Sequence, residues 1–147
     1  MRINLVVASY LRIAAEDLAG ARLLAEAENR NAIYLCSQAA EKVIRAVLTT
    51  EGKHAGIGHQ LVEMVDMIPD GNPIKPMLRK IDSLGDFATT FRYPTTVGKV
   101  RKVPKPEEFD RLAACVEEAL KEAVSRFEVD LEQERQPAGS VEPIRQL

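Results

Sequence analysis

The segment from Ile33 to Leu48, IYLCSQAAEKVIRAVL, constrains the fold more than any other part of the chain. Wound as a helix at ~100° per residue, its apolar side chains cover an arc of roughly 220°. A surface helix needs an apolar stripe only a little over ~100° wide. We therefore expect this helix to be packed on more than one side, as the central member of a helical bundle. Ser37 is the one polar residue inside the apolar arc, and Val43 lies at its middle.

The remaining arc of the same helix forms a polar strip. Its members are Tyr34, Gln38, Glu41, Lys42 and Arg45. As a site, the strip would offer Tyr34 and Gln38 for hydrogen bonds, and Lys42 and Arg45 for phosphate. As a solvated face, it would carry Glu41 and Arg45 as an i,i+4 ion pair worth only ~0.2–0.5 kcal/mol. The residues alone leave both interpretations open.

Helical spacing of apolar residues continues on both sides of this segment. The predicted helices cover residues 9–27, 33–51, 59–67, 74–91 and 107–131, after a short apolar lead-in at residues 1–8. We expect Ser9 to cap the first helix and Gly52 to end the central one. Pro94 should stop the fourth helix near Arg92, because the residue before a proline is pushed out of the α region. No alternating strand pattern is present, so we predict an all-α, up-and-down bundle of four main helices plus a short one.

The length of 147 residues and an apolar content of 46% are typical of one globular domain with a real core. We expect that domain to span residues 1–131 and to be followed by a frayed polar tail, residues 132–147. No apolar run approaches the ~18 residues of a membrane span, and the N-terminus lacks a signal-peptide pattern. Cys36 and Cys115 are far apart and have no metal-binding spacing. We expect a cytoplasmic protein with no membrane, metal or cofactor.

The stretch from Arg92 to Pro106, RYPTTVGKVRKVPKP, is predicted to be a long loop. Its basic residues are Arg92, Lys99, Arg101, Lys102 and Lys105, and it has no acidic residue, although the whole chain has a net charge of −2. Loops of this length in a compact domain are uncommon and tend to be functional or disordered. Basic side chains on such a loop suit phosphate or an acidic partner surface. A solubilising connection is the other interpretation.

Two histidines, His54 and His59, stand around Gly56 and Gly58. A histidine can transfer protons near neutral pH. The spacing of the pair is not that of a metal site, and no carboxylate cluster accompanies it. We therefore interpret them as a loop surface and a helix start.

Three landmarks, in order, resemble the HEPN family of small α-helical domains. They are AAEDLAGARLL at residues 14–24, YLCSQAAEKVIRAVL at residues 34–48 followed by GHQL at residues 58–61, and FRYP at residues 91–94. The block SQAAEKVIRA is the most specific of them. The resemblance implies a helical bundle that commonly forms a homodimer. It also implies a bacterial protein encoded beside a small nucleotidyltransferase, with which it makes a toxin–antitoxin pair.

Many members of that family are ribonucleases, whose motif is an arginine followed four to six residues later by a histidine at the end of the penultimate major helix. Arg92 falls on the arginine position, but residues 93–99 contain no histidine. The resemblance therefore implies a module in which metal-independent RNA cleavage is not expected. In this fold Gln38, Glu41 and Lys42 would line a cleft together with Arg92.

Three functional hypotheses follow. In the first, the chain is a homodimeric, non-catalytic module that pairs with a small nucleotidyltransferase or binds RNA or nucleotide phosphate. Its expected contacts are Arg92, Lys99, Arg101, Lys102, Gln38, Glu41, Lys42 and Arg45. In the second, it is a ribonuclease toxin that keeps Arg92 and replaces the missing histidine by His59 or Tyr93. In the third, it is a dimeric scaffold without a ligand. The missing histidine favours the first over the second, and the basic loop favours the first over the third.

Overall fold

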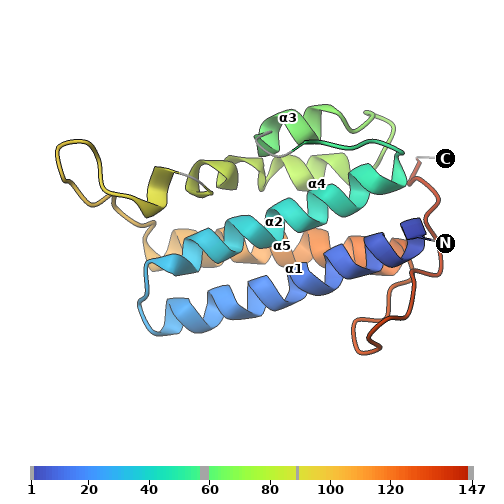
Figure 1. Ribbon diagram of the computed structural model, residues 1–147, viewed down its shortest axis with the longest axis horizontal. Coiled ribbons are helices and arrows are strands. Elements are labelled where there is room, and N and C mark those ends of the chain that lie inside the picture. The colour runs from blue at the N-terminus through green and yellow to red at the C-terminus, as the bar shows by residue number, and fades with distance from the viewer. Residues whose placement is uncertain (1, 57–59, 89, 146–147) are drawn as a thin grey trace.

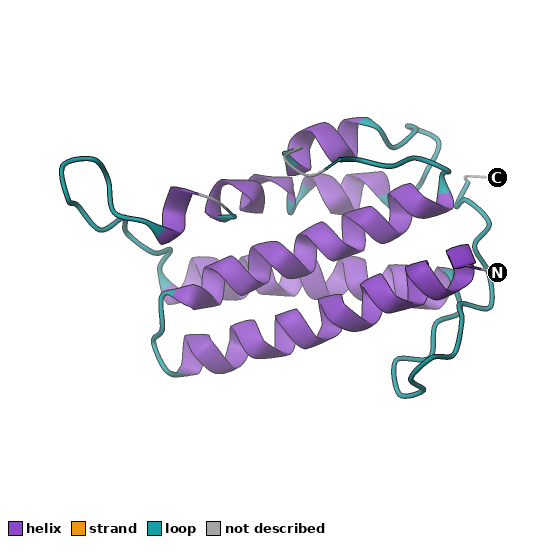
Figure 2. Cartoon of the chain, viewed as in Figure 1, coloured by secondary structure: helices purple, strands orange, loops and turns teal. Residues whose placement is uncertain are grey.

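The structure is a computed structural model that describes residues 2–56, 60–88 and 90–145. In these ranges the chain forms helices and no β-strand, which confirms the all-α class (Figure 2). The elements are α1 (Arg2–Glu26), α2 (Asn31–Thr50), α3 (Leu61–Asp66), α4 (Lys75–Arg79), the 3-10 helices η1 (Asp82–Phe87) and η2 (Thr90–Arg92), and α5 (Pro106–Arg126). Only α1, α2 and α5 are long, so the expected fourth main helix is not formed as one element.

Helix α2 is the central element, as its wide apolar arc predicts. It touches α1, α3, η1 and α5, and in Figure 1 it lies between α1 on one side and α3 and α4 on the other. Val43 is fully buried, and the hydroxyl of Ser37 donates to the Tyr34 carbonyl at 2.6 Å, which satisfies the one polar group in the arc. The helix ends at the predicted glycine: Gly52 has a φ of +71°, and the Lys53 amide donates to the Leu48 carbonyl at 2.9 Å.

The predicted start of the first helix is wrong. Helix α1 begins at Arg2, and Ser9 is an exposed residue within it instead of its cap. The buried residues Val7, Ala8 and Leu11 continue the core-facing side of the helix toward the N-terminus. Packing therefore extends the helix through the segment that the sequence predicts to be a lead-in.

The prediction of one continuous helix over residues 74–91 is also wrong. Most of the residues expected to face the core from this segment are nevertheless buried. Leu78, Ile81 and Leu84 are fully buried, but the backbone passes from α4 into η1 and η2. A spacing of three residues aligns side chains in a 3-10 helix, whose turn is tighter than that of an α-helix. Gly85 also lies close to Leu61, so that a Cβ on it would be 3.2 Å from the Leu61 Cγ. The segment packs against α2 and α3 as several short helices instead of one continuous helix.

Helix α5 begins at Pro106, one residue before the predicted start, and places Phe109, Val116 and Ala123 in the core. It ends at Arg126, so Leu131, the last residue of the predicted helix, lies beyond it and is 38% exposed. The segment after it returns along the end of the bundle where both termini lie (Figure 1). There the Ala138 amide donates to the Asn4 carbonyl at 3.0 Å.

The polar tail, predicted to be frayed, makes specific contacts in the described range. Ala138 and Ile144 are buried. Arg12 of α1 donates to the carbonyls of Asp130 and Gln136 at 2.9 and 2.7 Å. These contacts fix the tail against the N-terminal half of α1.

Candidate functional site

Arg92 and Tyr34 lie against each other at one end of the bundle. The Arg92 guanidinium carbon is 4.3 Å from the centroid of the Tyr34 ring and 5.5 Å from that of the Tyr93 ring. Both distances lie within the range of cation–π contacts. Arg92 is exposed and Tyr93 is 60% exposed, so a cation and an aromatic face are presented to solvent together. The start of α2 and the end of η2 therefore form one surface site.

The rest of the polar strip is paired within the chain. Lys42 Nζ lies 3.4 Å from an Asp17 carboxylate oxygen and 3.1 Å from the Gln38 side-chain oxygen. Arg45 pairs with Glu41 at 3.2 Å, as the solvated-face interpretation expects. Any phosphate that bound these cations would have to displace the groups that already hold them.

The strip is also too long to form a single cleft with Arg92. Arg45 follows Tyr34 by three helical turns, which corresponds to roughly 16 Å along the axis of α2. Its guanidinium turns to the carbonyl of Ala55, to which it donates at 2.8 Å. The structure brings Tyr34 to Arg92, and it leaves Glu41 at the middle of α2 and Arg45 nearer its other end.

The basic loop contains no helix or strand between Tyr93 and Lys105, as predicted. It projects beyond the end of the bundle, at the left of Figure 1. Its tip is a turn in which the Gly98 amide donates to the Thr95 carbonyl, and the Thr95 amide donates to the Lys99 carbonyl, both at 2.8 Å. Gly98 has a φ of +81°, a conformation that a glycine adopts without strain. The loop is thus a small hairpin-like turn on two extended arms.

The cations of the loop remain available for a ligand. Lys99, Arg101 and Lys102 are exposed, and none of them forms an ion pair with a residue that the structure describes. Together with Arg92 they make a local positive surface on a chain whose net charge is −2. Such a surface attracts phosphate even when the protein as a whole is acidic.

Arg30 is a residue that the sequence analysis missed. Its guanidinium donates to the carbonyls of Phe91 and Arg101, at 3.3 and 3.2 Å, and its carbon lies 5.1 Å from the centroid of the Phe91 ring. One side chain at the start of α2 therefore holds both η2, just before the loop, and the returning arm of the loop. No spacing in the sequence indicates this role, because the partners are backbone carbonyls.

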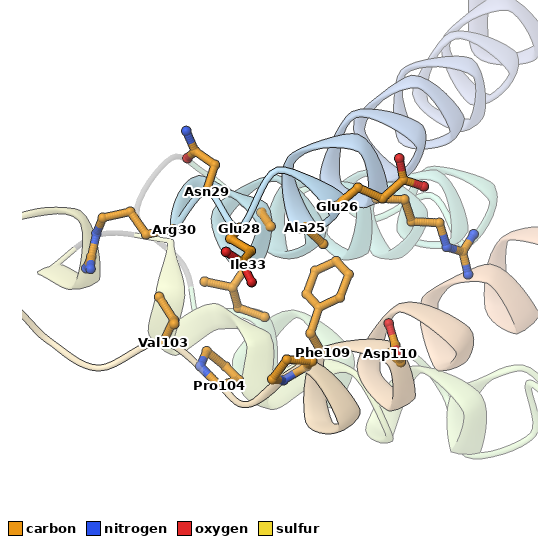
Figure 3. Close-up of a pocket in the computed structure, with 13 residues that line it drawn as sticks. Ala25, Glu26, Glu28, Asn29, Arg30, Ile33, Val103, Pro104, Phe109 and Asp110 are labelled. Carbon is orange, nitrogen blue, oxygen red and sulfur yellow. The ribbon is translucent and has the colours of Figure 1, made fainter.

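A pocket of about 620 Å³ lies beside the loop, between the end of α1, the start of α2 and the start of α5. Ile33 and Phe109 face each other across it, and Val103 and Pro104 of the loop close one side (Figure 3). The sequence analysis did not find this pocket, because its walls come from three separate segments. Its lining also includes charged side chains, among them Arg22, Glu26 and Asp110.

The described residues hold few groups that could move a proton near Arg92. His59, the expected substitute for the missing histidine, lies outside the described residues, and His54 is exposed in the loop after α2. Within the ranges that the structure describes, no three histidine, cysteine or acidic side chains gather as a metal site would require. No helix in those ranges is both long and apolar enough to cross a membrane. The arrangement at Arg92 is suited to binding an anion that carries an aromatic base.

One comparison with known proteins, with protein-family models, gives a match that covers most of the helical part of the chain. The family model described as the HEPN domain matches residues 7–127. The matched segment runs from the first turns of α1 to the end of α5, and it includes the polar strip, Arg92 and the basic loop. No curated protein and no solved structure matches the chain significantly.

Proposed function

The chain belongs to the HEPN domain family, since the family model covers most of it, and we propose that it is a homodimeric, non-catalytic module that binds the phosphates of RNA or of a nucleotide. Its protein partner, in this proposal, is a small nucleotidyltransferase in a toxin–antitoxin-like pair in the bacterial cytoplasm. The phosphate contacts come first from Arg92 and then from Lys99, Arg101 and Lys102. Gln38, Glu41, Lys42 and Arg45 contribute less, because they are paired or lie far along α2.

One observation carries the phosphate-binding part of this proposal. Arg92 is exposed but held over the Tyr34 ring, and Tyr93 presents a second ring beside it. An arginine whose position is already fixed loses less conformational freedom when it binds a phosphate. An exposed tyrosine ring can stack on any nucleobase, which contributes ~1–3 kcal/mol per base in single-stranded complexes.

The experiment is a binding titration with a fluorescently labelled single-stranded RNA, followed by anisotropy at several salt concentrations. Arg92→Ala should weaken binding and reduce its salt dependence, since each lost phosphate contact lowers the slope of log K against log salt by ~0.7 for a single strand. The matched control is Arg126→Ala. It removes an exposed arginine from the C-terminal end of α5, the end away from the basic loop, where Arg126 pairs with Glu122. Equal binding by the parent and the Arg92 variant would refute the site.

A second candidate function is a metal-independent ribonuclease with a divergent site. It is favoured by the presence of Arg92 at the position of the family motif, exposed at the end of η2. Against it stands the lack of a histidine in residues 93–99, because arginine stabilises negative charge but does not transfer protons at neutral pH. RNA cleavage therefore separates the two candidates.

A further inference from the structure

The pocket between α1, α2 and α5 has the size and the apolar walls of a small-molecule site. Ile33 and Phe109 face each other across it, and Val103 and Pro104 close the side toward the loop (Figure 3). Its volume of about 620 Å³ lies within the ~300–1,000 Å³ that such sites usually have. The pocket can therefore bury the apolar body of an organic ligand.

The walls of this pocket are held in place by contacts within the chain. Arg30 donates to the Arg101 carbonyl at 3.2 Å, and this bond holds the returning arm of the loop against the bundle. Pro104 and Pro106 follow on that arm and line the pocket, and each proline ring fixes its own φ angle. A ligand would enter a site that is already formed, which lowers the entropic cost of binding.

Three acidic residues, Glu26, Glu28 and Asp110, line the pocket. In Figure 3 the Glu28 carboxylate lies beside Ile33, and Asp110 lies on the Phe109 side, whereas Glu26 extends outward. None of the three carboxylates forms an ion pair or a hydrogen bond with a residue that the structure describes. Two carboxylates without a partner thus lie next to the apolar walls.

The two basic residues of the lining are engaged elsewhere. Arg22 pairs at 3.3 Å with Glu117, which does not line the pocket. Arg30 directs its guanidinium to the carbonyls of Phe91 and Arg101. Lys105, between the two prolines, is exposed and is not part of the lining. Acidic groups therefore dominate the charge that a ligand meets in the pocket, so a cation is attracted and an anion is repelled.

We propose that this pocket binds a small organic amine, with the apolar body of the ligand between Ile33 and Phe109 and its ammonium group toward Glu28 and Asp110. The apolar body gains free energy by leaving water. Hydrogen bonds from an ammonium group to a carboxylate are roughly twice as strong as those between neutral groups. The pocket includes neither Arg92 nor the exposed cations of the loop. An amine and an RNA phosphate would therefore bind at different places.

The test uses tryptamine, an indole that carries an ammonium group on a short chain. The protein contains no tryptophan, so indole fluorescence excited beyond the absorption of tyrosine comes from the probe alone, and its anisotropy measures binding as protein is added. Two matched ligands keep the indole: tryptophol has a hydroxyl in place of the amine, and indolepropionate ends in a carboxylate. Tryptamine should bind at least about 10-fold more tightly than tryptophol, and indolepropionate should bind most weakly of the three. Absence of tryptamine binding, or equal affinity for either of the other ligands, would overturn the proposal.

Two variants locate the ammonium group, because each removes one charge and nearly preserves the shape of the side chain. Glu28→Gln and Asp110→Asn should each weaken tryptamine binding by about 3- to 10-fold and leave tryptophol binding unchanged. Unchanged tryptophol binding also shows that the walls of the pocket are intact. The matched control is Glu118→Gln, which removes an exposed acid from α5 outside the lining and should not affect either ligand. Tryptamine binding that survives both charge variants, or an equal loss of tryptamine and tryptophol, would refute the site.

Discussion

Arg145 donates from both of its terminal guanidinium nitrogens to the carboxylate of Glu51, at 2.5 and 2.7 Å. The two residues join the C-terminal segment to the end of α2. Asn72 donates to the same carboxylate at 3.1 Å, so three distant segments meet at one nearly buried acid. These hydrogen bonds, that of Arg145 first, hold the pKa of Glu51 below its usual range although burial opposes them.

Glu51→Gln should lower the free energy of unfolding at neutral pH by about 1 kcal/mol, a figure reduced for the solvent exposure of Arg145. The lowered pKa means that the folded state binds this proton less readily than the unfolded state does. The stabilisation is therefore present above the ordinary glutamate value of about 4.3 and is lost as the pH falls through the folded-state value. Urea unfolding at pH 7 and at pH 3 checks this, and a difference between parent and variant that grows in acid would contradict it.

Val43→Asp should destabilise the domain by several kcal/mol, a large part of the ~5–15 kcal/mol available to a domain. Val43 is fully buried in α2, so the carboxylate would have neither water nor a cation beside it. Ala114→Asp, at an exposed position in α5, introduces the same group and is the control. Thermal unfolding measures both, and an unchanged midpoint for Val43→Asp would be incompatible with the burial of α2.

The two cysteines should differ sharply in reactivity. Burial raises the pKa of Cys36 to about 12, whereas Cys115 is partly exposed. Since the thiolate is the reactive form, the native protein should titrate one thiol rapidly with Ellman's reagent and the second only after unfolding. Cys115→Ser should abolish the rapid phase, and a rapid phase that persists in this variant would show that Cys36 is accessible.

The purified protein should not cleave single-stranded RNA in EDTA at a toxin-like rate. A positioned acid or base contributes ~10²–10⁴-fold to such a reaction, and Arg92 cannot supply one. The assay compares the parent with Arg92→Ala and His59→Ala. If the parent cleaves RNA and either variant does not, the ribonuclease function would replace the binding function as the proposal.

The sequence predicts the parts of the fold that depend on local periodicity. The wide apolar arc of α2 and its end at Gly52 are features of one segment, and both are confirmed. The break after α4 depends instead on the close approach of Gly85 to Leu61, which no local pattern records. The predicted start of α1 is wrong for a similar reason, because contacts of Val7 and of the distant Ala138 support the turns before Ser9.

In the candidate site, too, the local features were predictable from the sequence and the contacts between distant residues were not. The excess of basic residues in the loop can be read directly from the chain, and so can the i,i+4 pair of Glu41 and Arg45. The contact of Arg92 with Tyr34 joins residues far apart in the sequence. The family resemblance grouped Arg92 with Gln38, Glu41 and Lys42, and it did not indicate this contact. Arg30 and the pocket beside Phe109 depend on backbone carbonyls and on three converging segments, so they could not be predicted.

The projecting loop is also a place where a protease could cut the chain once. Trypsin has exposed sites after Lys99, Arg101 and Lys102 in this loop. A single cut there would leave one fragment with α1 to η2 and another with α5 and the C-terminal segment. We expect the two pieces to co-elute in native gel filtration and to separate only in denaturant, because α5 is buried against the other helices and Arg145 bonds Glu51 across the cut. The two fragments would then serve as halves of a split protein, whose reassembly reports when two attached partners meet.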